Sequence, residues 1–205
     1  LSINGRHSHR LSPLIEKLCL PTLVIADLDT AEKEGHHKAV CPERKKGLIS
    51  SNYTITDWIT GEKDLDKLLD IPADQKEIVK QGVCKYSIRI AYQTPVKINY
   101  NGAEVEALAS TFEDCLVYTN LQLFENISVD DTGSLIKNVS DKIKLASSFE
   151  EFHQGVYDVL RNGRSDQKAE FALDLIYAVD PSELSVPAYI DEGLGWLQDY
   201  LTPEE

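Results

Sequence analysis

The sequence predicts an α/β fold with a mainly parallel sheet, joined to a helical insert or appendage. The first observation is the continuous apolar and β-branched run at 22–26, which is typical of a strand buried on both faces. The second is a short helical pattern at 12–20 directly before that run, as in a parallel α/β core. The third is the mainly helical spacing of apolar residues from Glu104 onward.

The N-terminal elements follow from local signals. Leu1–Asn4 is an apolar stretch that predicts a short strand, and Gly5–Arg10 predicts a polar and basic loop. Ser12 and Pro13 indicate a helix start, because a hydroxyl can cap the first turn and proline needs no N–H there. Pro21 ends that helix, since it cannot continue the helical hydrogen bonds.

The remaining elements are predicted from periodicity and breakers. A polar stretch without periodicity follows Asp29 to about Ile49, and loops of this length are usually functional or disordered. Asn101-Gly102 is a turn signal. Helices are expected around 53–58, 64–69, 74–81, 106–118, 135–146, 149–160, 168–179 and 190–201, and strands at 86–92 and 96–100.

Length and charge limit the function classes. The 205 residues fit one large domain, or one domain with an appendage. The formal net charge of −13 argues against a protein with the basic footprint of a nucleic-acid binder. The first hundred residues are nearly balanced, however, and the acidic excess falls in the second half, so the first half could still meet an anion.

Cysteine usage and the absence of apolar segments bear on location. The four cysteines form no CxxC pair, and scattered thiols fit a reducing, cytoplasmic compartment. They are Cys19, Cys41, Cys84 and Cys115. No apolar run approaches the roughly 20 residues of a membrane span. The chain has no Met and opens as if already inside a strand, so we interpret it as a fragment of a longer protein.

Asp27-x-Asp29, at the end of the predicted strand, is the sharpest local feature. Ligands bind at the carboxyl ends of strands in open parallel sheets. Two carboxylates this close need a counter-charge when buried, and a divalent cation is the usual one. A solvated turn or a cap for the following segment is the alternative.

Two further segments add groups of the same chemistry. Glu113 and Asp114 offer carboxylates in or before a helix. Lys168 begins an apolar helix, where a lysine is usually a surface residue whose stem covers apolar neighbours. Beside carboxylates and a metal, it would instead be a natural partner for a phosphate or a leaving oxygen.

The ordered set of these motifs resembles a known family. The strand with Asp27-Leu28-Asp29-Thr30 resembles the DxD motif of Toprim domains. Four more stretches resemble the C-terminal Toprim region of OLD-family (overcoming lysogenization defect) ATP-dependent endonucleases. They are GRHSH at 5–9, GLISSNYTI at 47–55, TFED at 111–114 and KAEFALD at 168–174. Together they span nearly the whole chain except about the last 25 residues.

The resemblance implies a domain plan. It predicts a Toprim-like Rossmannoid core at 1–120 and 165–180, a helical insert at 121–164 and a C-terminal helical tail at 181–205. It also implies DNA as substrate, a homodimer in the full-length protein, and an N-terminal ATPase domain of the same parent chain. ATP would bind only to that upstream domain, because this chain has no Walker-type Gly-rich loop.

The resemblance further implies a metal-dependent DNA endonuclease that hydrolyses phosphodiesters with two Mg²⁺ or Mn²⁺ ions. Asp27 would bind or bridge metal, and Asp29 would be a further ligand or orient a bound water. Glu113 would supply a carboxylate from the opposite side, with Asp114 as the fallback. Lys168 would neutralise charge on the phosphate or the leaving oxygen.

One departure from the family pattern limits this prediction. Toprim domains carry a glutamate after their first strand, before the DxD motif. Nothing upstream of Asp27 fits, since Glu16 lies within the short helix and Gly5 follows Asn4. The simplest interpretation is that the fragment starts after that strand, so the isolated chain is expected to bind metal weakly or to be inactive.

Other interpretations of the same residues stay open. Zinc could bind His36, His37 and Cys41, or a His7-x-His9 pair, although no second ligand pair lies at a sensible spacing. Ser51 and Asn52 could contact a nucleic-acid backbone, but their place at a helix entry favours an N-cap.

Two alternative functions follow from the same residues. A haloacid-dehalogenase-type phosphatase would use Asp27 as nucleophile and Asp29 as acid/base. That family needs Thr or Val two residues after the second Asp, where Ala31 stands, with Thr30 one position early. A non-catalytic dimerisation or DNA-docking module is the remaining alternative.

Overall fold

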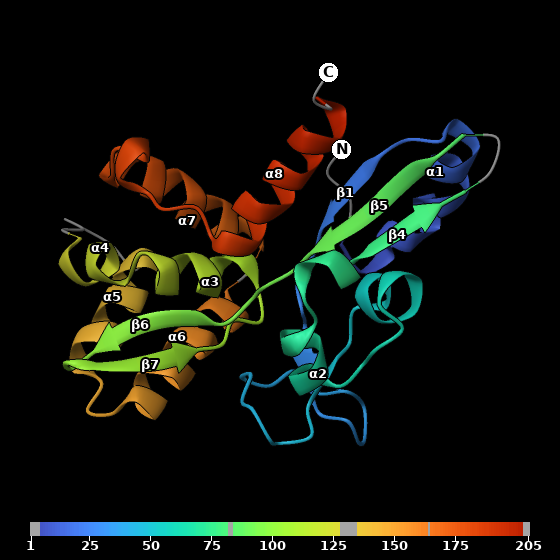
Figure 1. Cartoon of the computed structure of the whole chain (residues 1–205). Coiled ribbons are helices and arrows are strands. Elements are labelled where there is room, and N and C mark those ends of the chain that lie inside the picture. The colour runs from blue at the N-terminus through green and yellow to red at the C-terminus, as the bar shows by residue number, and fades with distance from the viewer. Residues whose placement is uncertain (1–4, 82–83, 128–134, 164, 203–205) are drawn as a thin grey trace. The chain divides into compact units, whose positions relative to one another are not determined.

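The computed structural model describes residues 5–81, 84–127, 135–163 and 165–202 (Figure 1). The strands are β1 (Thr22–Ile25), β2 (Thr30–Ala31), β3 (Ile49–Ser50), β4 (Glu77–Lys80), β5 (Tyr86–Ala91), β6 (Val96–Tyr100) and β7 (Ala103–Ala107). The α-helices are α1 (Ser12–Leu18), α2 (Leu65–Asp70), α3 (Phe112–Thr119), α4 (Leu121–Asn126), α5 (Leu135–Leu145), α6 (Phe149–Asn162), α7 (Ser165–Ala178) and α8 (Ala188–Leu201). Short 3₁₀ helices are η1 (Gly5–Leu11), η3 (Ala73–Gln75) and η4 (Pro181–Glu183), and η2 (Thr54–Ile59) is a π-helix.

The described residues form two compact units. Unit 1 lies within Leu1–Thr94 and Pro187–Glu205, and unit 2 lies within Pro95–Val186. The mixture of strands and helices confirms the predicted α/β class. The Toprim-like core and its predicted division into core, insert and tail stay predictions.

A three-stranded sheet with the order β1-β5-β4 forms the centre of unit 1. β1 pairs with β5 in parallel, with Val24 opposite Ile90, and β4 pairs with β5 antiparallel, with Ile78 opposite Ile88. All residues of β5 are buried, as expected for a central strand covered on both faces. Helix α8 packs against β1 and β5 (Figure 1).

Helix α8 is held on the sheet by polar contacts as well as by packing. Arg89, which is buried in β5, forms an ion pair with Glu192 of α8. The indole N–H of Trp196 donates to Glu77 of β4 at 3.2 Å. These contacts fix the C-terminal helix to two strands of the same sheet.

Lys76 is a buried cation beside this sheet. Its ammonium lies 4.1 Å from the centre of the Tyr92 ring, a cation–π contact. Burial lowers the pKa of Lys76 to about 8, although the nearby Glu192 carboxylate acts in the opposite direction. The Tyr92 hydroxyl donates to the carbonyl oxygen of Leu68 in α2 at 2.8 Å, and burial raises the pKa of Tyr92.

Unit 2 begins with the β6–β7 hairpin. Its turn residues Asn101 and Gly102 both have positive φ, which matches the tight turns that Asn-Gly favours. The predicted turn is therefore confirmed. The prediction of a helix from Glu106 was wrong at its start, because 103–107 form β7 and the helix α3 begins only at Phe112.

An aromatic cluster fills the core of unit 2. The Tyr100 ring stacks on Phe152 with 5.3 Å between ring centres, and Tyr118 meets Phe152 edge-on at 5.7 Å. The Tyr100 hydroxyl donates to the Ser148 carbonyl at 3.1 Å, at the start of α6. The predicted helices at 135–146, 149–160, 168–179 and 190–201 are confirmed as α5, α6, α7 and α8, with shifted ends.

Three predictions about the sheets and loops need correction. The sheets are not mainly parallel, since β1–β5 is the parallel pair and the other strand pairs are antiparallel among the described residues. The expected helix at 74–81 is η3 followed by β4, because the short segment pairs with β5 instead of completing a helix. The basic loop at 5–10 is the 3₁₀ helix η1. The expected strand at Leu1–Asn4 lies outside the described residues.

Cys19 and Cys84 form a disulfide, with 6.3 Å between their Cα atoms. The prediction of free thiols was therefore wrong for these two. Cys19 follows α1, and an ion pair of 3.5 Å between Glu16 and Lys80 holds α1 beside the end of β4. The two cysteines are 65 residues apart in sequence, so only this packing brings them together.

No helix among the described residues is long and apolar enough to cross a membrane.

Raising the pH from 8 to 10 is expected to add, through Lys76, on the order of 2 kcal/mol to the free energy of unfolding of unit 1. In the unfolded chain Lys76 has its usual pKa of 10.5, whereas in the folded chain its pKa is about 8. Between these two values the unfolded chain binds the proton more tightly, so a rise in pH favours the folded chain. Lys76→Met should remove this increase, and the exposed Lys85→Met should keep it. Urea unfolding followed by the fluorescence of Trp58 and Trp196, both in unit 1, measures the effect. An equal pH slope in Lys76→Met would contradict it.

Candidate functional site

Asp27 and Asp29 lie in the loop that directly follows β1, at the carboxyl end of the strand. Both side chains are partly exposed, while Leu28 between them is completely buried. Asp29 has a φ of +50°, a left-handed conformation that Asp tolerates better than most residues. The buried leucine therefore anchors the loop, and the two carboxylates lie on either side of it.

Gln93 holds the first half of this loop. Its side chain is completely buried, and its Nε2 donates to Asp27 Oδ1 at 2.8 Å. Its Oε1 accepts from the Leu28 backbone N–H at 2.8 Å. The parallel register explains the meeting, because Ile25 lies opposite Ala91 and two further residues on each strand bring Asp27 opposite Gln93.

The segment from Ser50, the last residue of β3, to the start of η2 holds the three carbonyl groups of the same loop; we call it the β3–η2 segment. The Asn52 side-chain amide donates to the Asp27 carbonyl at 2.8 Å. The Ser50 hydroxyl donates to the Leu28 carbonyl at 2.6 Å. Ser51 donates to the Asp29 carbonyl through its hydroxyl at 2.9 Å and its backbone N–H at 3.1 Å. The backbone of the loop is thereby fixed at three successive residues.

Asn52 also fulfils the role predicted for a helix entry. Its Oδ1 accepts from the Thr54 backbone N–H at 3.0 Å, where η2 begins. Thr54 Oγ1 in turn accepts from the backbone N–H of His9 in η1 at 3.4 Å. The motif segment at 5–9 thus contacts the segment at 47–55, which in turn holds the Asp27–Asp29 loop within unit 1.

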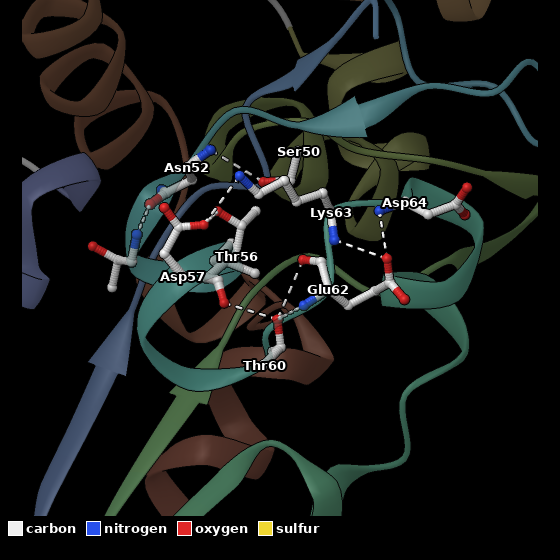
Figure 2. Close-up of polar contacts among 10 residues, drawn as sticks. Ser50, Asn52, Thr56, Asp57, Thr60, Glu62, Lys63 and Asp64 are labelled. Carbon is white, nitrogen blue, oxygen red and sulfur yellow. Dashed lines mark hydrogen bonds and ion pairs between the residues drawn. The ribbon is translucent and has the colours of Figure 1, made fainter.

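A polar network braces the β3–η2 segment (Figure 2). The Ser50 N–H donates to the Lys63 carbonyl at 2.9 Å, and the Lys63 ammonium pairs with Asp57 of η2 at 3.2 Å. The backbone amides of Asp64 and Lys63 donate to Glu62 Oε1 and hold the pKa of Glu62 below its usual range. This bracing limits the freedom of the segment that supports the loop.

Glu113 and Lys168 meet in unit 2. Lys168 Nζ of α7 lies 2.9 Å from Glu113 Oε1 of α3. The Glu113 side chain is 17% exposed and that of Lys168 is 34% exposed, so both groups reach solvent. Sequence analysis predicted both residues as site members, and the structure brings these two into contact.

Asp114 has a structural function in the same helix. The residue is buried, and its carboxylate accepts from the backbone N–H groups of Ser110, Thr111 and Cys115 at 2.8–3.0 Å. The Thr111 hydroxyl donates to the same carboxylate at 3.1 Å. These bonds cap the first turn of α3, which leaves Glu113 as the carboxylate of the pair that faces Lys168.

The predicted site residues therefore divide between the units. Unit 1 holds Asp27 and Asp29, and unit 2 holds Glu113, Asp114 and Lys168. The donor set of unit 1, two partly exposed carboxylates on a fixed loop, fits the hard oxygen ligands of Mg²⁺ or Mn²⁺.

Clusters with more metal-binding groups are not found in the part of the chain that the structure describes. Within 5–81, 84–127, 135–163 and 165–202, no group of three or more His, Cys, Asp or Glu side chains could hold a metal ion. This includes the alternative zinc ligands His36, His37 and Cys41. The ring of His37 instead contacts the Glu32 carbonyl at 3.2 Å.

Sequence reasoning missed Gln93 and its second partner, Tyr189. Gln93 Nε2 also donates to the hydroxyl of Tyr189 in α8, at 3.2 Å. In the sequence, Gln93-Thr94-Pro95 indicates a strand end and nothing more. The signal that could have found Gln93 is its place at the carboxyl end of the predicted strand at 86–92, had that strand been paired in parallel with 22–26.

The whole chain is similar to endonuclease GajA from Bacillus cereus (strain HuB5-5), with 25% identity over 209 residues. The similarity covers 100% of this chain and the C-terminal 27% of GajA, so the chain spans less than a third of this relative's length. GajA is an OLD-family nuclease, and the similarity confirms the resemblance that the motifs indicated. No family model matches the chain, and no solved structure matches it.

Asp114→Ala is expected to lower the free energy of unfolding by about 1–2 kcal/mol. The substitution removes the cap of α3 and leaves buried backbone N–H groups without an acceptor. Glu113→Ala removes a partly exposed ion pair and should cost about 1 kcal/mol or less. Urea unfolding followed by far-UV circular dichroism compares the two variants. Equal costs would contradict the structural function assigned to Asp114.

Proposed function

We propose that this chain is the nuclease region of a metal-dependent DNA endonuclease of the OLD type. The observation that carries the proposal is the similarity to endonuclease GajA over the whole chain. The fixed Asp27–Asp29 loop supports it, because two carboxylates at the end of a strand suit a divalent cation. The activity proposed is phosphodiester hydrolysis.

Asp27 and Asp29 are the proposed metal ligands of unit 1. When bound, two Mg²⁺ or Mn²⁺ ions would supply charge neutralisation at the phosphate and an activated water. The chain's own contribution is to keep both carboxylates in place before binding. Gln93 holds the Asp27 carboxylate directly, and Asn52 and Ser51 hold the backbone of the loop that carries both carboxylates.

Lys168 is the proposed partner of the phosphate or the leaving oxygen, and Glu113 the further carboxylate ligand. In the structure the Glu113 carboxylate holds the Lys168 ammonium at 2.9 Å, with the lysine one-third exposed. The ammonium thus lies beside a carboxylate and still reaches solvent, where an anion can approach it. Asp114 retains its function as a cap.

Substrate and partners follow from the family resemblance and belong to this proposal. We assign DNA as substrate, a second copy of the protein as partner, and an ATP-binding domain in a longer parent chain. The charge distribution agrees with DNA binding by the first half of the chain, since the acidic excess lies in the second half. The chain alone is expected to bind DNA weakly, and the bound cation and the longer protein would supply the missing attraction.

Asp27→Asn and Lys168→Ala are each expected to reduce Mg²⁺- or Mn²⁺-dependent DNA nicking by the protein that carries this chain, by about 100-fold or more. Asp27→Asn should also weaken Mn²⁺ binding, which isothermal titration calorimetry measures, whereas Lys168→Ala should not. Asp74→Asn and Lys144→Ala, at exposed positions of the same units, are the matched controls.

Cleavage by both variants at the wild-type rate would overturn the proposed mechanism. The phosphatase alternative would show itself by turnover of small phosphomonoesters with an acyl-phosphate trapped on Asp27. A non-catalytic docking module would bind DNA without any metal requirement.

A further inference from the structure

We propose that Gln93 is a positioning residue for Asp27, and that the orientation of Gln93 depends on the position of helix α8 through the hydrogen bond to Tyr189. The affinity of the Asp27–Asp29 loop for a divalent cation would then depend on how the C-terminal helix lies on the sheet. This inference rests on the proposed function, since it concerns the metal ligands of that site.

The hydrogen bonds of Gln93 determine one orientation of Asp27. A carboxamide has one acceptor oxygen and two N–H donors. The oxygen accepts from the Leu28 N–H at 2.8 Å, and the nitrogen donates to Asp27 Oδ1 at 2.8 Å and to Tyr189 at 3.2 Å. Because Gln93 is completely buried, exchanging any of these partners for water is costly.

Tyr189 connects the Gln93 side chain, and so its hydrogen bond to Asp27, to the first turn of α8. The residue is 3% exposed, and its hydroxyl accepts from the Gln93 nitrogen that also holds Asp27. A displacement of α8 would move this hydroxyl away. Gln93 would then lose one of its three partners and with it part of the force that fixes its rotamer.

Gly193 lies where α8 closely approaches the sheet. A Cβ atom on this residue would lie 3.1 Å from the Ala91 Cβ and 3.1 Å from the Leu23 Cδ1. Glycine therefore permits close contact between α8 and the strands β1 and β5 that carry the site. Gly195, two residues later, has nothing within 4 Å of its Cβ position, so the same helix offers a matched control.

The first experiment measures the Mn²⁺ affinity of the protein that carries this chain by isothermal titration calorimetry. Gln93→Met, which keeps the length of the side chain but has no donor, should weaken Mn²⁺ binding about 10- to 100-fold. Tyr189→Phe should weaken it less, by about 3- to 10-fold, because Gln93 keeps two partners. Tyr92→Phe is the control, since it removes a buried hydrogen bond next to Gln93 that does not involve Asp27.

The second experiment compares two glycines of α8. Gly193→Ala should lower Mn²⁺ affinity about 3- to 10-fold, because the added Cβ is too close to Ala91 and Leu23 and pushes α8 away from β1 and β5 by a few tenths of an ångström. Gly195→Ala should leave the affinity unchanged while it raises the thermal stability, since alanine favours a helix. Asp27→Asn in the same series shows that the measured ion binds at the loop.

The outcomes separate this inference from the proposed function. A wild-type protein that binds no Mn²⁺, or whose Asp27→Asn variant binds it equally well, overturns the metal site and the inference with it. Binding that is lost in Asp27→Asn but kept in Gln93→Met overturns the inference alone. An equal loss in Gln93→Met and Tyr92→Phe also overturns it, because general destabilisation would then explain the effect.

Discussion

The buried carboxamide of Gln93 is the constraint on which the candidate site of unit 1 depends. A carboxamide that is completely removed from water must find partners for its oxygen and its nitrogen within the fold. Here the partners are the carboxylate of Asp27, the amide of Leu28 and the hydroxyl of Tyr189. Gln93 thereby joins the strand end, the loop and the C-terminal helix through the hydrogen bonds of one buried side chain.

The parallel pairing of β1 with β5 explains why this constraint lies where it does. Two neighbouring parallel strands end at the same edge of a sheet, so the residues that follow them lie close together without any other contact. The antiparallel strand β4 occupies the other side of β5 and leaves this edge unaffected. The β3–η2 segment then completes the support, since its side chains take up the carbonyl groups of 27–29.

Local signals predicted the elements but not the pairings. The strand at 22–26 and its Asp27-x-Asp29 exit could be predicted, because apolar β-branched runs and acidic exits are local patterns. The strands β4 and β7 could not, since each is a short segment whose partner, not its periodicity, makes it a strand. Gln93 and the Cys19–Cys84 disulfide were missed for a related reason: both depend on contacts across 65 or 66 residues.

The Glu113–Lys168 pair in unit 2 suits a function better than it suits stability. A partly exposed ion pair contributes about 0–1 kcal/mol, so the fold gains little from keeping it. The same small energy means that Lys168 can exchange Glu113 for another anion at little cost. Asp114 shows the opposite case, since its carboxylate is buried and tied to backbone amides. Of two adjacent carboxylates, one is therefore committed to the helix, and the other stays available for a cation or for the lysine.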